Sequence, residues 1–410
     1  MRDAIEEFRD DYAGRYAAGV RAFLGRHGRE LCRELQGAPA RARSTVYIFG
    51  NGGSHAIGKC IEFALQRHAA ARGAVLRVRT GVDVHLVNCL GAGGDPGISF
   101  AGVLEAEGAD ARDLLVLISG SGDSDNLCEA ASYATRHSLP TVALVGSGRG
   151  RLSGVVPPGR CFSAPFEDQQ ISEDIIQSLA HLLERPAPEG RRGDWAASVA
   201  AHAEGLARAL RAIPADFISA AAAAAVKAFR RGRFVLVSGF DDPALSACAE
   251  HTAHNLYWDS VYQVESPPRR LIRSSPTACD FSGISNDRHG RYLSHLTGAG
   301  DVGGDGVALF YSMSLDSPAL LEVVGRLHAE GVPALVVAAG EGRAREYANV
   351  KACTTGLREP QAQAGVAQVF GHILGRLIRL MLLGRGEGSD SAAARFLIEH
   401  DLAQRRLLNE

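Results

Sequence analysis

The chain has 410 residues, of which 46% are hydrophobic and 22% charged, a composition typical of globular proteins that excludes a disordered chain. Its length exceeds that of one ordinary core and predicts two domains of about 200 residues each. The formal net charge is −2, with Lys and Arg spread along the chain. A nucleic-acid partner is therefore not expected, because it would need clustered positive charge.

Neither a membrane anchor nor export is expected. No apolar run reaches the roughly 18 residues of a membrane span, and the acidic start of the chain lacks the basic-then-apolar order of a signal peptide. The eight cysteines are scattered without a CxxC pair, which favours reduced thiols over a disulfide framework. We therefore expect a cytoplasmic protein.

The first half of the chain alternates helices with apolar strands. Helices are predicted over residues 1–38, 54–70, from about 125, and 170–184; strands are predicted over 45–49, 75–78, 84–89, 114–118 and 141–145. Strands that alternate with helices imply an α/β fold in which a parallel sheet is covered by helices on both faces.

The segment 185–195 is rich in proline, glycine and charge, and we interpret it as a linker. The same order then restarts. Strands are predicted over 234–238, 306–311 and 334–338. Helices are predicted over 195–230, 245–256 and 364–383, with one more between the strands at 306–311 and 334–338. We therefore expect domains at 1–185 and 194–390.

The two halves share landmarks at a nearly constant offset of about 190 residues, which indicates an internal duplication. The matching pairs are Gly50 with Gly239, Asp95 with Asp287, Ser119 with Ser312, Ser121 with Ser314, Ser124 with Ser317, Gln177 with Gln368, and His181 with His372.

Two glycine- and serine-rich loops follow strands in the first half and have the features of an anion cradle. The first is Gly50-Asn51-Gly52-Gly53-Ser54, and the second runs from Ser119 to Ser124 with a further hydroxyl at Ser121. Backbone N–H groups at the start of a helix attract an anion. Neither loop has the lysine of a triphosphate-binding loop or the GxGxxG of a dinucleotide fold. The pair suits the single phosphate of a metabolite; two ordinary turns are the alternative.

The strings GNGGS, ISGSGDSDN and TVALVG resemble the sugar isomerase (SIS) domain, and within it the phosphoheptose isomerase group. The resemblance covers about residues 5–185, and a weaker copy covers about 195–385. It implies two doubly wound domains, each a parallel five-stranded sheet flanked by helices, and a sugar-phosphate ligand. The phosphate ligands that it implies are Ser54, Ser119, Ser121 and Ser124, with Asp95 and Asp287 near the sugar.

The resemblance also implies an acid–base set, from which the first half departs. The family has a histidine and a glutamate one turn apart after the first loop; here those positions are Cys60 and Ala64, with Glu62 close by. On the last helix Glu173 stands where the family has glutamine, and His181 follows eight residues later as in the family.

The second half keeps more of this set. Glu250 and His254 are four residues apart, on one face of a helix, as are Gln368 and His372. Some family members hold zinc with such residues, so Glu250, His254, Gln368 and His372 are candidate zinc ligands. Because active sites of the family lie at subunit junctions, we hypothesise that the first half binds phosphate, the second supplies the acid or base, and the chain forms a homodimer.

We therefore expect a sugar-phosphate aldose–ketose isomerase that moves a proton between C1 and C2 through an enediol. The resemblance favours a heptulose 7-phosphate or a longer ketose phosphate as substrate. The alternative is a non-catalytic sugar-phosphate sensor or assembly adaptor, which the residues at positions 60 and 64 favour.

Overall fold

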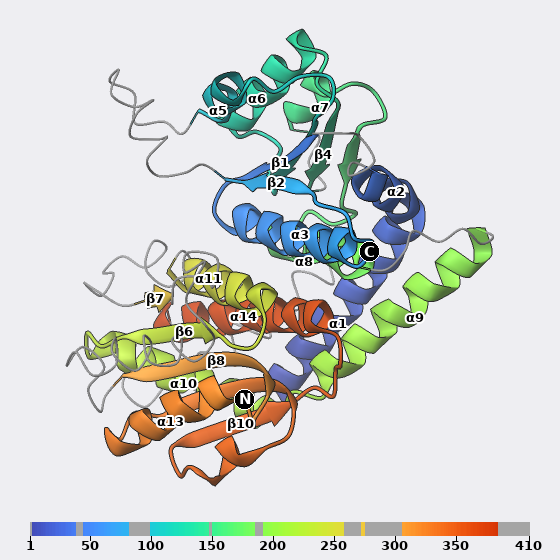
Figure 1. Ribbon diagram of the computed structural model, residues 1–410. Coiled ribbons are helices and arrows are strands. Elements are labelled where there is room, and N and C mark those ends of the chain that lie inside the picture. The colour runs from blue at the N-terminus through green and yellow to red at the C-terminus, as the bar shows by residue number, and fades with distance from the viewer. Residues whose placement is uncertain are drawn as a thin grey trace. The chain divides into compact units, whose positions relative to one another are not determined.

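The computed structural model describes residues 2–37, 44–81, 99–146, 150–184, 192–257, 272–274 and 306–383. The chain divides into two units, coloured along the sequence in Figure 1. We call Tyr16–Glu204 the N-terminal unit, and Met1–Arg15 together with Gly205–Glu410 the C-terminal unit. The boundaries between the units fall inside two helices, α1 (Arg2–Phe23) and α9 (Arg192–Arg211).

The N-terminal unit contains a five-stranded sheet in the order β2-β1-β3-β4-β5, with every neighbouring pair parallel. Its strands are β1 (Thr45–Gly50), β2 (Arg77–Thr80), β3 (Leu114–Ser119), β4 (Thr141–Val145) and β5 (Cys161–Ser163). The central strand β3 is buried along its whole length and almost entirely apolar, as expected for a strand covered on both faces. The predicted strand at 84–89 lies outside the described residues.

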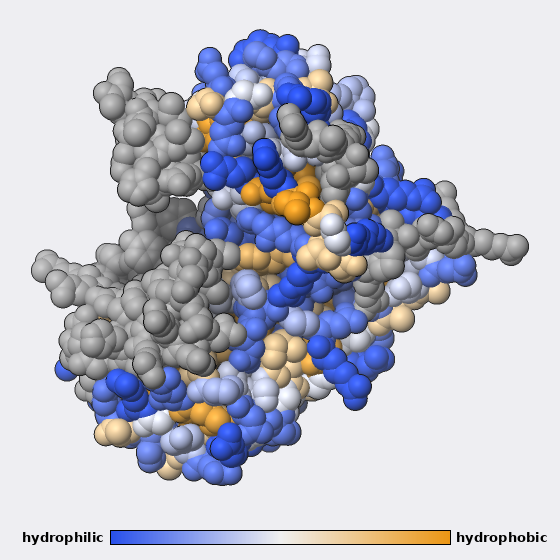
Figure 2. Space-filling view, in the orientation of Figure 1, coloured by the Kyte–Doolittle hydropathy of each residue, from blue (hydrophilic) through white to orange (hydrophobic). Residues whose placement is uncertain are grey.

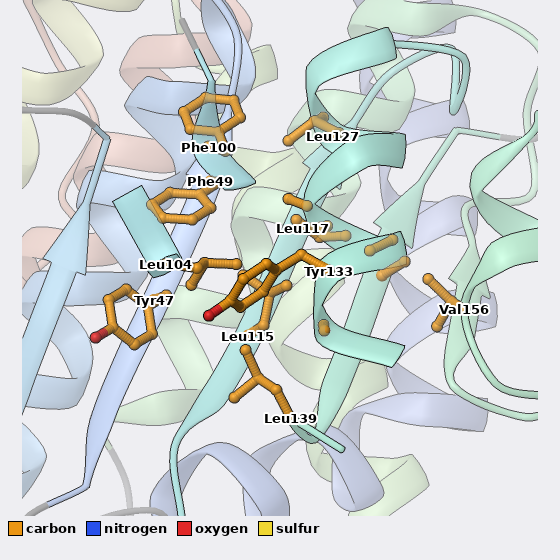
Figure 3. Close-up of a cluster of buried hydrophobic side chains, with 14 of the residues drawn as sticks. Tyr47, Phe49, Phe100, Leu104, Leu115, Leu117, Leu127, Tyr133, Leu139 and Val156 are labelled. Carbon is orange, nitrogen blue, oxygen red and sulfur yellow. The ribbon is translucent and has the colours of Figure 1, made fainter. Parts of the chain in front are cut away.

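Helices cover both faces of this sheet. They are the second part of α1, the π-helical turn η1 (Leu24–Gly28), α2 (Arg29–Gly37), α3 (Gly53–Ala70), α5 (Phe100–Glu107), α6 (Asp125–Arg136), α7 (Leu152–Val155) and α8 (Gln169–Leu183). Helices α5 and α6 pack on the face that carries Tyr47 and Phe49, where Phe49 and Phe100 stack with ring centroids 4.6 Å apart (Figure 3). Helix α3 packs on the other face, where Gly58 contacts Ile48.

The C-terminal unit repeats this architecture with a parallel five-stranded sheet in the order β10-β9-β8-β6-β7. Its strands are β6 (Val235–Gly239), β7 (Ile272–Ser274), β8 (Val307–Ser314), β9 (Ala334–Gly340) and β10 (Val350–Thr354). Two diverged copies of one doubly wound α/β domain were predicted, and the two sheets confirm that prediction.

The helices of the C-terminal unit also lie on both faces of its sheet. They are α10 (Ala215–Arg230), α11 (Pro243–Tyr257), α13 (Pro318–Ala329), the 3-10 turn η4 (Arg343–Glu346) and α14 (Pro360–Leu383). Helix α13 packs against Phe310 on one face, whereas Tyr311 on the other face meets Phe370 of α14. Helices α10 and α14 are joined by Phe217 and Phe370.

Helix α14 is the one single helix in the described part of the chain that is long and apolar enough, by composition, to cross a membrane. Its apolar window is 72% buried inside the structure, and the buried side chains of Gln363, Gln368 and His372 interrupt it. These features are typical of the central helix of a folded domain. The bent pair of α9 and α10 passes the same test only when both helices are counted together.

The helix after the linker expected at 185–195 begins earlier than the composition suggested. Helix α9 begins at Arg192, and Trp195 is buried inside the N-terminal unit. The indole Nε1 of Trp195 donates a hydrogen bond to the carbonyl oxygen of Leu24 at 2.9 Å. The burial of the Trp195 ring and the hydrogen bond of its indole nitrogen thus stabilise the first turn of α9.

The face of the molecule in Figure 2 is covered mainly by hydrophilic side chains, between which small apolar areas are visible. Among the described residues, Val75 is a large hydrophobic residue that is 92% exposed. Scattered apolar residues are ordinary on protein surfaces and do not mark a partner by themselves.

Candidate functional site

The two predicted phosphate loops lie at the same edge of the N-terminal sheet. Strands β1 and β3 are parallel neighbours, so the turn after Gly50 and the loop after Ser119 leave the sheet side by side. The side chains of Asn51 and Asn126 join them, since each Nδ2 donates to the other Oδ1 at 3.0 Å. Gly52 precedes α3 with a φ of 51°, a conformation that glycine adopts without strain.

The loop from Ser119 to Ser124, here called the serine loop, is ordered by hydrogen bonds between its own residues. Ser119 Oγ accepts from the backbone N–H of Gly122 at 2.9 Å, and Ser121 Oγ accepts from that of Asp123 at 3.2 Å. Ser124 Oγ lies 3.5 Å from Ser119 Oγ at the start of α6. Because Ser119 and Ser121 use a lone pair in these contacts, their hydroxyl hydrogens remain suited to donate to an anion.

Arg151 fixes the outer side of this loop and was not singled out from the sequence. Its backbone N–H donates to Asp123 Oδ1 at 2.9 Å, and its guanidinium donates to Asp125 Oδ1 at 2.7 Å and to the carbonyl oxygen of Asp123. Two carboxylates therefore compensate its positive charge. Arg151 orders the loop and is not a dedicated cation for a phosphate.

Helix α8 begins against the serine loop and carries Glu173. A Cβ on Gly120 would lie 2.7 Å from Gln169 Cγ, so the first turn of α8 touches the loop. Gln169 Nε2 donates to Glu173 Oε1 at 3.3 Å, and Glu173 is buried. Two turns further along, Nδ1 of the buried His181 lies 2.9 Å from His202 Nε2. Glu173 is thus close to the loop, whereas His181 pairs with another imidazole.

Glu62 lies half-buried on α3, away from the start of that helix. Gln66 Nε2 donates to its Oε1 at 3.1 Å. Burial raises the pKa of the Glu62 carboxyl above its usual range, and the neighbouring polar and charged groups only partly offset this effect. Ser54, by contrast, is buried at the first turn of α3, where it packs closely against Gly50.

The C-terminal unit brings two buried imidazoles together. His251 on α11 and His372 on α14 have ring centroids 5.0 Å apart with an edge-to-face angle of 83°. His251 Nδ1 lies 2.9 Å from Gln368 Oε1. Because an amide oxygen can only accept, Nδ1 of His251 carries a hydrogen in this contact.

Helix α11 also makes a buried contact with strand β8. Thr252 Oγ1 lies 2.9 Å from the hydroxyl oxygen of Tyr311 on β8. A Cβ on Gly371 of α14 would come within 2.3 Å of Thr252 Oγ1. The absence of a side chain at position 371 therefore lets α11 approach α14 closely enough for their imidazoles to meet.

His251 occupies the repeat position of Cys60. In the N-terminal unit Gln177 Nε2 donates to Cys60 Sγ at 3.7 Å, and this pair is 117 residues apart in the sequence, as are His251 and Gln368. Sequence reasoning missed His251. The offset that relates Gln177 to Gln368 also relates Cys60 to His251, and this signal could have found it.

Glu250 and His254, the residues predicted on α11, flank His251 and differ from it in exposure. Glu250 is half-buried and His254 is exposed, whereas the residue that faces Gln368 and His372 is His251. The roles predicted for Glu250 and His254 stay predictions. Asp95 and Asp287 lie outside the described residues.

The C-terminal unit offers donor atoms that suit a metal ion. The ligand nitrogens of His251 and His372 lie within 4.8 Å of one another, and both residues are buried. Imidazole nitrogen is a common ligand of zinc, so these two residues could hold such an ion. Gln368, another predicted ligand, contacts His251 through its Oε1.

A hollow of about 550 Å³ in the N-terminal unit is separate from these residues. Arg29 and Arg33 of α2 line it together with Trp195 and the acidic Glu30 and Glu34. It includes none of the residues predicted for phosphate binding or proton transfer. Mixed charges around it give no preference for an anion.

Comparison with known proteins adds a family and several relatives. The model of the SIS domain matches residues 38–146, which include both loops of the N-terminal unit. The chain is 29% identical to a phosphoheptose isomerase from Akkermansia muciniphila over 144 residues, which is 35% of this chain and 75% of that protein.

Two solved structures resemble nearly the whole chain. Tagatose-6-phosphate ketose/aldose isomerase from Escherichia coli has a TM-score of 0.57 at 11% identity, covering 91% of this chain and 92% of its own. The C-terminal domain of glucosamine-fructose-6-phosphate aminotransferase from Francisella tularensis has a TM-score of 0.59 at 11% identity, covering 93% of this chain and 96% of its own. At such identities the likeness shows the fold.

Proposed function

Because the chain is a SIS domain protein with two SIS-like sheets and a distant homologue of a phosphoheptose isomerase, we propose that it is a sugar-phosphate aldose–ketose isomerase. The observation that carries this proposal is the serine loop at the carboxyl end of β3, where Ser119, Ser121 and Ser124 gather before a helix. The proposed substrate is a heptulose 7-phosphate or a longer ketose phosphate.

The serine loop accounts for the phosphate end of the substrate. The hydroxyl oxygens of Ser119 and Ser121 accept from the backbone of their own loop, so the loop is ordered before a ligand binds and little ordering remains to be done on binding. The N-terminus of α6 adds the positive end of a helix dipole. A monoester phosphate fits such neutral donors better than a polyphosphate, which usually requires lysine or a metal ion.

The imidazole pair of the C-terminal unit accounts for the proton transfer. Aldose–ketose isomerisation removes a proton from the carbon next to the carbonyl and returns it to the neighbouring carbon, while the oxygens exchange a proton. His251, whose Nδ1 contacts Gln368, and His372 place two imidazoles side by side, and imidazole is a common general acid or base. A metal ion bound by these imidazoles would add polarisation of the carbonyl.

The N-terminal unit is poorly equipped for the same step. At the positions where the family has its histidine and glutamate it has Cys60 and Ala64, both buried. We therefore assign phosphate binding to the N-terminal unit and acid–base chemistry to the C-terminal unit. The kinetics of variants test the hypothesis that the two halves divide this work. Size-exclusion chromatography tests the predicted homodimer, and cell fractionation tests the predicted cytoplasmic location.

A second candidate function is a non-catalytic sugar-phosphate sensor or assembly adaptor. Cys60 and Ala64 favour it, because a unit that has lost both acid–base residues can still bind a phosphate through its loop. His251 and His372 favour the enzyme, since they place two imidazoles, a common acid–base group, in contact.

The deciding experiment incubates the protein with a panel of ketose phosphates of five to seven carbons in deuterated water and follows aldose formation by NMR. An isomerase incorporates deuterium at C2 of the aldose and converts at least one substrate. The Ser121→Ala variant is the matched control, because contaminating isomerases would be unaffected by it. Binding of a ketose phosphate without any exchange or conversion would favour the sensor.

A further inference from the structure

In the C-terminal unit, the loop from Ser312 to Ser317 already binds a carboxylate, and this carboxylate is a side chain of the same unit. Asp241 Oδ2 accepts a hydrogen bond from Ser312 Oγ at 2.5 Å and another from the backbone N–H of Met313 at 2.9 Å. Ser312 is the repeat counterpart of Ser119, the first serine of the phosphate loop in the N-terminal unit. A carboxylate oxygen therefore occupies hydrogen-bond donors that correspond to part of the phosphate cradle.

Asp241 reaches this loop from the position that Gly52 has in the other unit. Both residues come second after the glycine that ends the first strand, and both have positive φ, 51° for Gly52 and 72° for Asp241. Aspartate is among the few residues with a side chain that tolerate this conformation. The two positions thus share a positive φ, and the C-terminal unit has a carboxylate at this position.

The rest of the loop keeps the organisation of an anion cradle. Ser314 Oγ accepts from the N–H of Asp316 at 3.0 Å, just as Ser121 Oγ accepts from that of Asp123. Ser317 caps α13, as its side chain accepts from the N–H of Leu320. The serine positions therefore remain, although the glycine turn that would let a ligand approach has changed.

We propose that the C-terminal unit retains a latent binding site for a phosphate monoester or inorganic phosphate, and that the Asp241 carboxylate keeps this site closed. A phosphate and the Asp241 carboxylate cannot share the same two donors, because the two negative charges would repel one another and the donors are already used by the carboxylate. Removing the carboxylate frees the N–H of Met313 for an external anion. The Ser312 hydroxyl, which also lies 2.8 Å from the carbonyl oxygen of Ser314, can then turn toward that anion.

The test uses the full-length chain and the variant Asp241→Gly, which restores the residue type of the N-terminal turn and suits the positive φ. Binding of radiolabelled inorganic phosphate is measured by equilibrium dialysis. Together with the proposed function, the inference predicts one phosphate per wild-type chain and two per Asp241→Gly chain. Ser314→Ala in the variant background should remove the added site, and Ser121→Ala the original one.

Asp242→Asn is the matched control, because it removes the same charge from the same turn. Asp242 Oδ1 accepts from the N–H of Ala244 at the start of α11, a contact that asparagine can keep. This variant should bind phosphate like the wild type. If Asp241→Gly does not fold by circular dichroism, Asp241→Asn, which tolerates the same backbone, takes its place with a weaker gain.

The outcomes separate this inference from the proposed function. No phosphate on the wild type and one on Asp241→Gly would leave the latent site standing and remove the N-terminal loop as a phosphate site. Equal stoichiometry for wild type and both Asp241 variants, or a gain in Asp242→Asn of the same size, would overturn the latent site.

Discussion

His251 Nδ1 lies 2.9 Å from Gln368 Oε1, and the corresponding pair in the other unit is Cys60 with Gln177 at 3.7 Å. The two units thus place a glutamine on the last helix against the same position of the helix that follows the first strand. One copy has a titratable imidazole at that position and the other a thiol. This difference makes the C-terminal unit the better candidate for proton transfer.

Replacing His372 by alanine should lower kcat by about 10²–10⁴-fold, because a positioned acid or base typically contributes that much to the rate. His251→Ala should have an effect of similar size. Affinity for the ketose phosphate should stay nearly unchanged, since binding is assigned to the serine loop. Initial rates and ligand titrations of purified variants check both statements.

His181→Ala and Cys60→Ala are the matched controls for these variants, as they change the repeat counterparts in the N-terminal unit. Both should retain turnover. Loss of activity in His181→Ala with activity intact in His372→Ala would place the chemistry in the N-terminal unit and contradict the assignment.

Ser121→Ala should weaken phosphosugar binding about 10- to 100-fold, which corresponds to the roughly 1.5–3 kcal/mol of a hydrogen bond to a charged group. Ser314→Ala, its counterpart in the C-terminal unit, should leave binding unchanged because Asp241 closes that loop. Calorimetric titration of both variants with one sugar phosphate measures the difference. Equal losses would show that the two loops contribute alike.

Gly371→Ala should destabilise the protein by about 1–3 kcal/mol, the usual cost of inserting atoms into a packed core. The added Cβ would lie 2.3 Å from Thr252 Oγ1, so α11 and α14 would have to separate. Gly205→Ala in α9 is the control: its Cβ meets nothing within 4 Å, and alanine favours a helix by about 1 kcal/mol. Urea unfolding of the two variants should move in opposite directions.

Glu62→Gln should stabilise the protein increasingly as the pH rises. Burial raises the pKa of Glu62 above its ordinary value, so the folded state binds this proton more tightly than the unfolded chain does. The stability that this proton provides is present at low pH and is lost as the pH rises through the raised pKa. Glutamine stays neutral at every pH, so the variant does not lose this stability as the pH rises.

The measurement for Glu62 is the free energy of unfolding of wild type and variant at pH 4 and at pH 7.5. The advantage of Glu62→Gln should be larger at the higher pH. An advantage that is constant or shrinks with pH would mean that the contact with Gln66 outweighs the cost of burying the charge.

The sequence by itself determined the architecture and the position of the two glycine- and serine-rich loops. Alternating strands and helices, repeated at a nearly constant offset, specified two parallel α/β units, because a buried parallel strand must be apolar and must return through a helix. The serine loops were also readable, since glycine and serine between a strand and a helix form a local structure that depends little on the rest of the chain.

Only the tertiary structure decided which side chains face one another. Four-residue spacing on α11 indicated Glu250 and His254, whose roles stay predictions, but spacing alone did not indicate that His251 meets α14. The close approach at Gly371 and the contact with Gln368 select His251. Asp241 likewise lies next to Ser312 only after β6 and β8 have paired, because residues far apart in sequence become neighbours through strand pairing and packing, which no local pattern encodes.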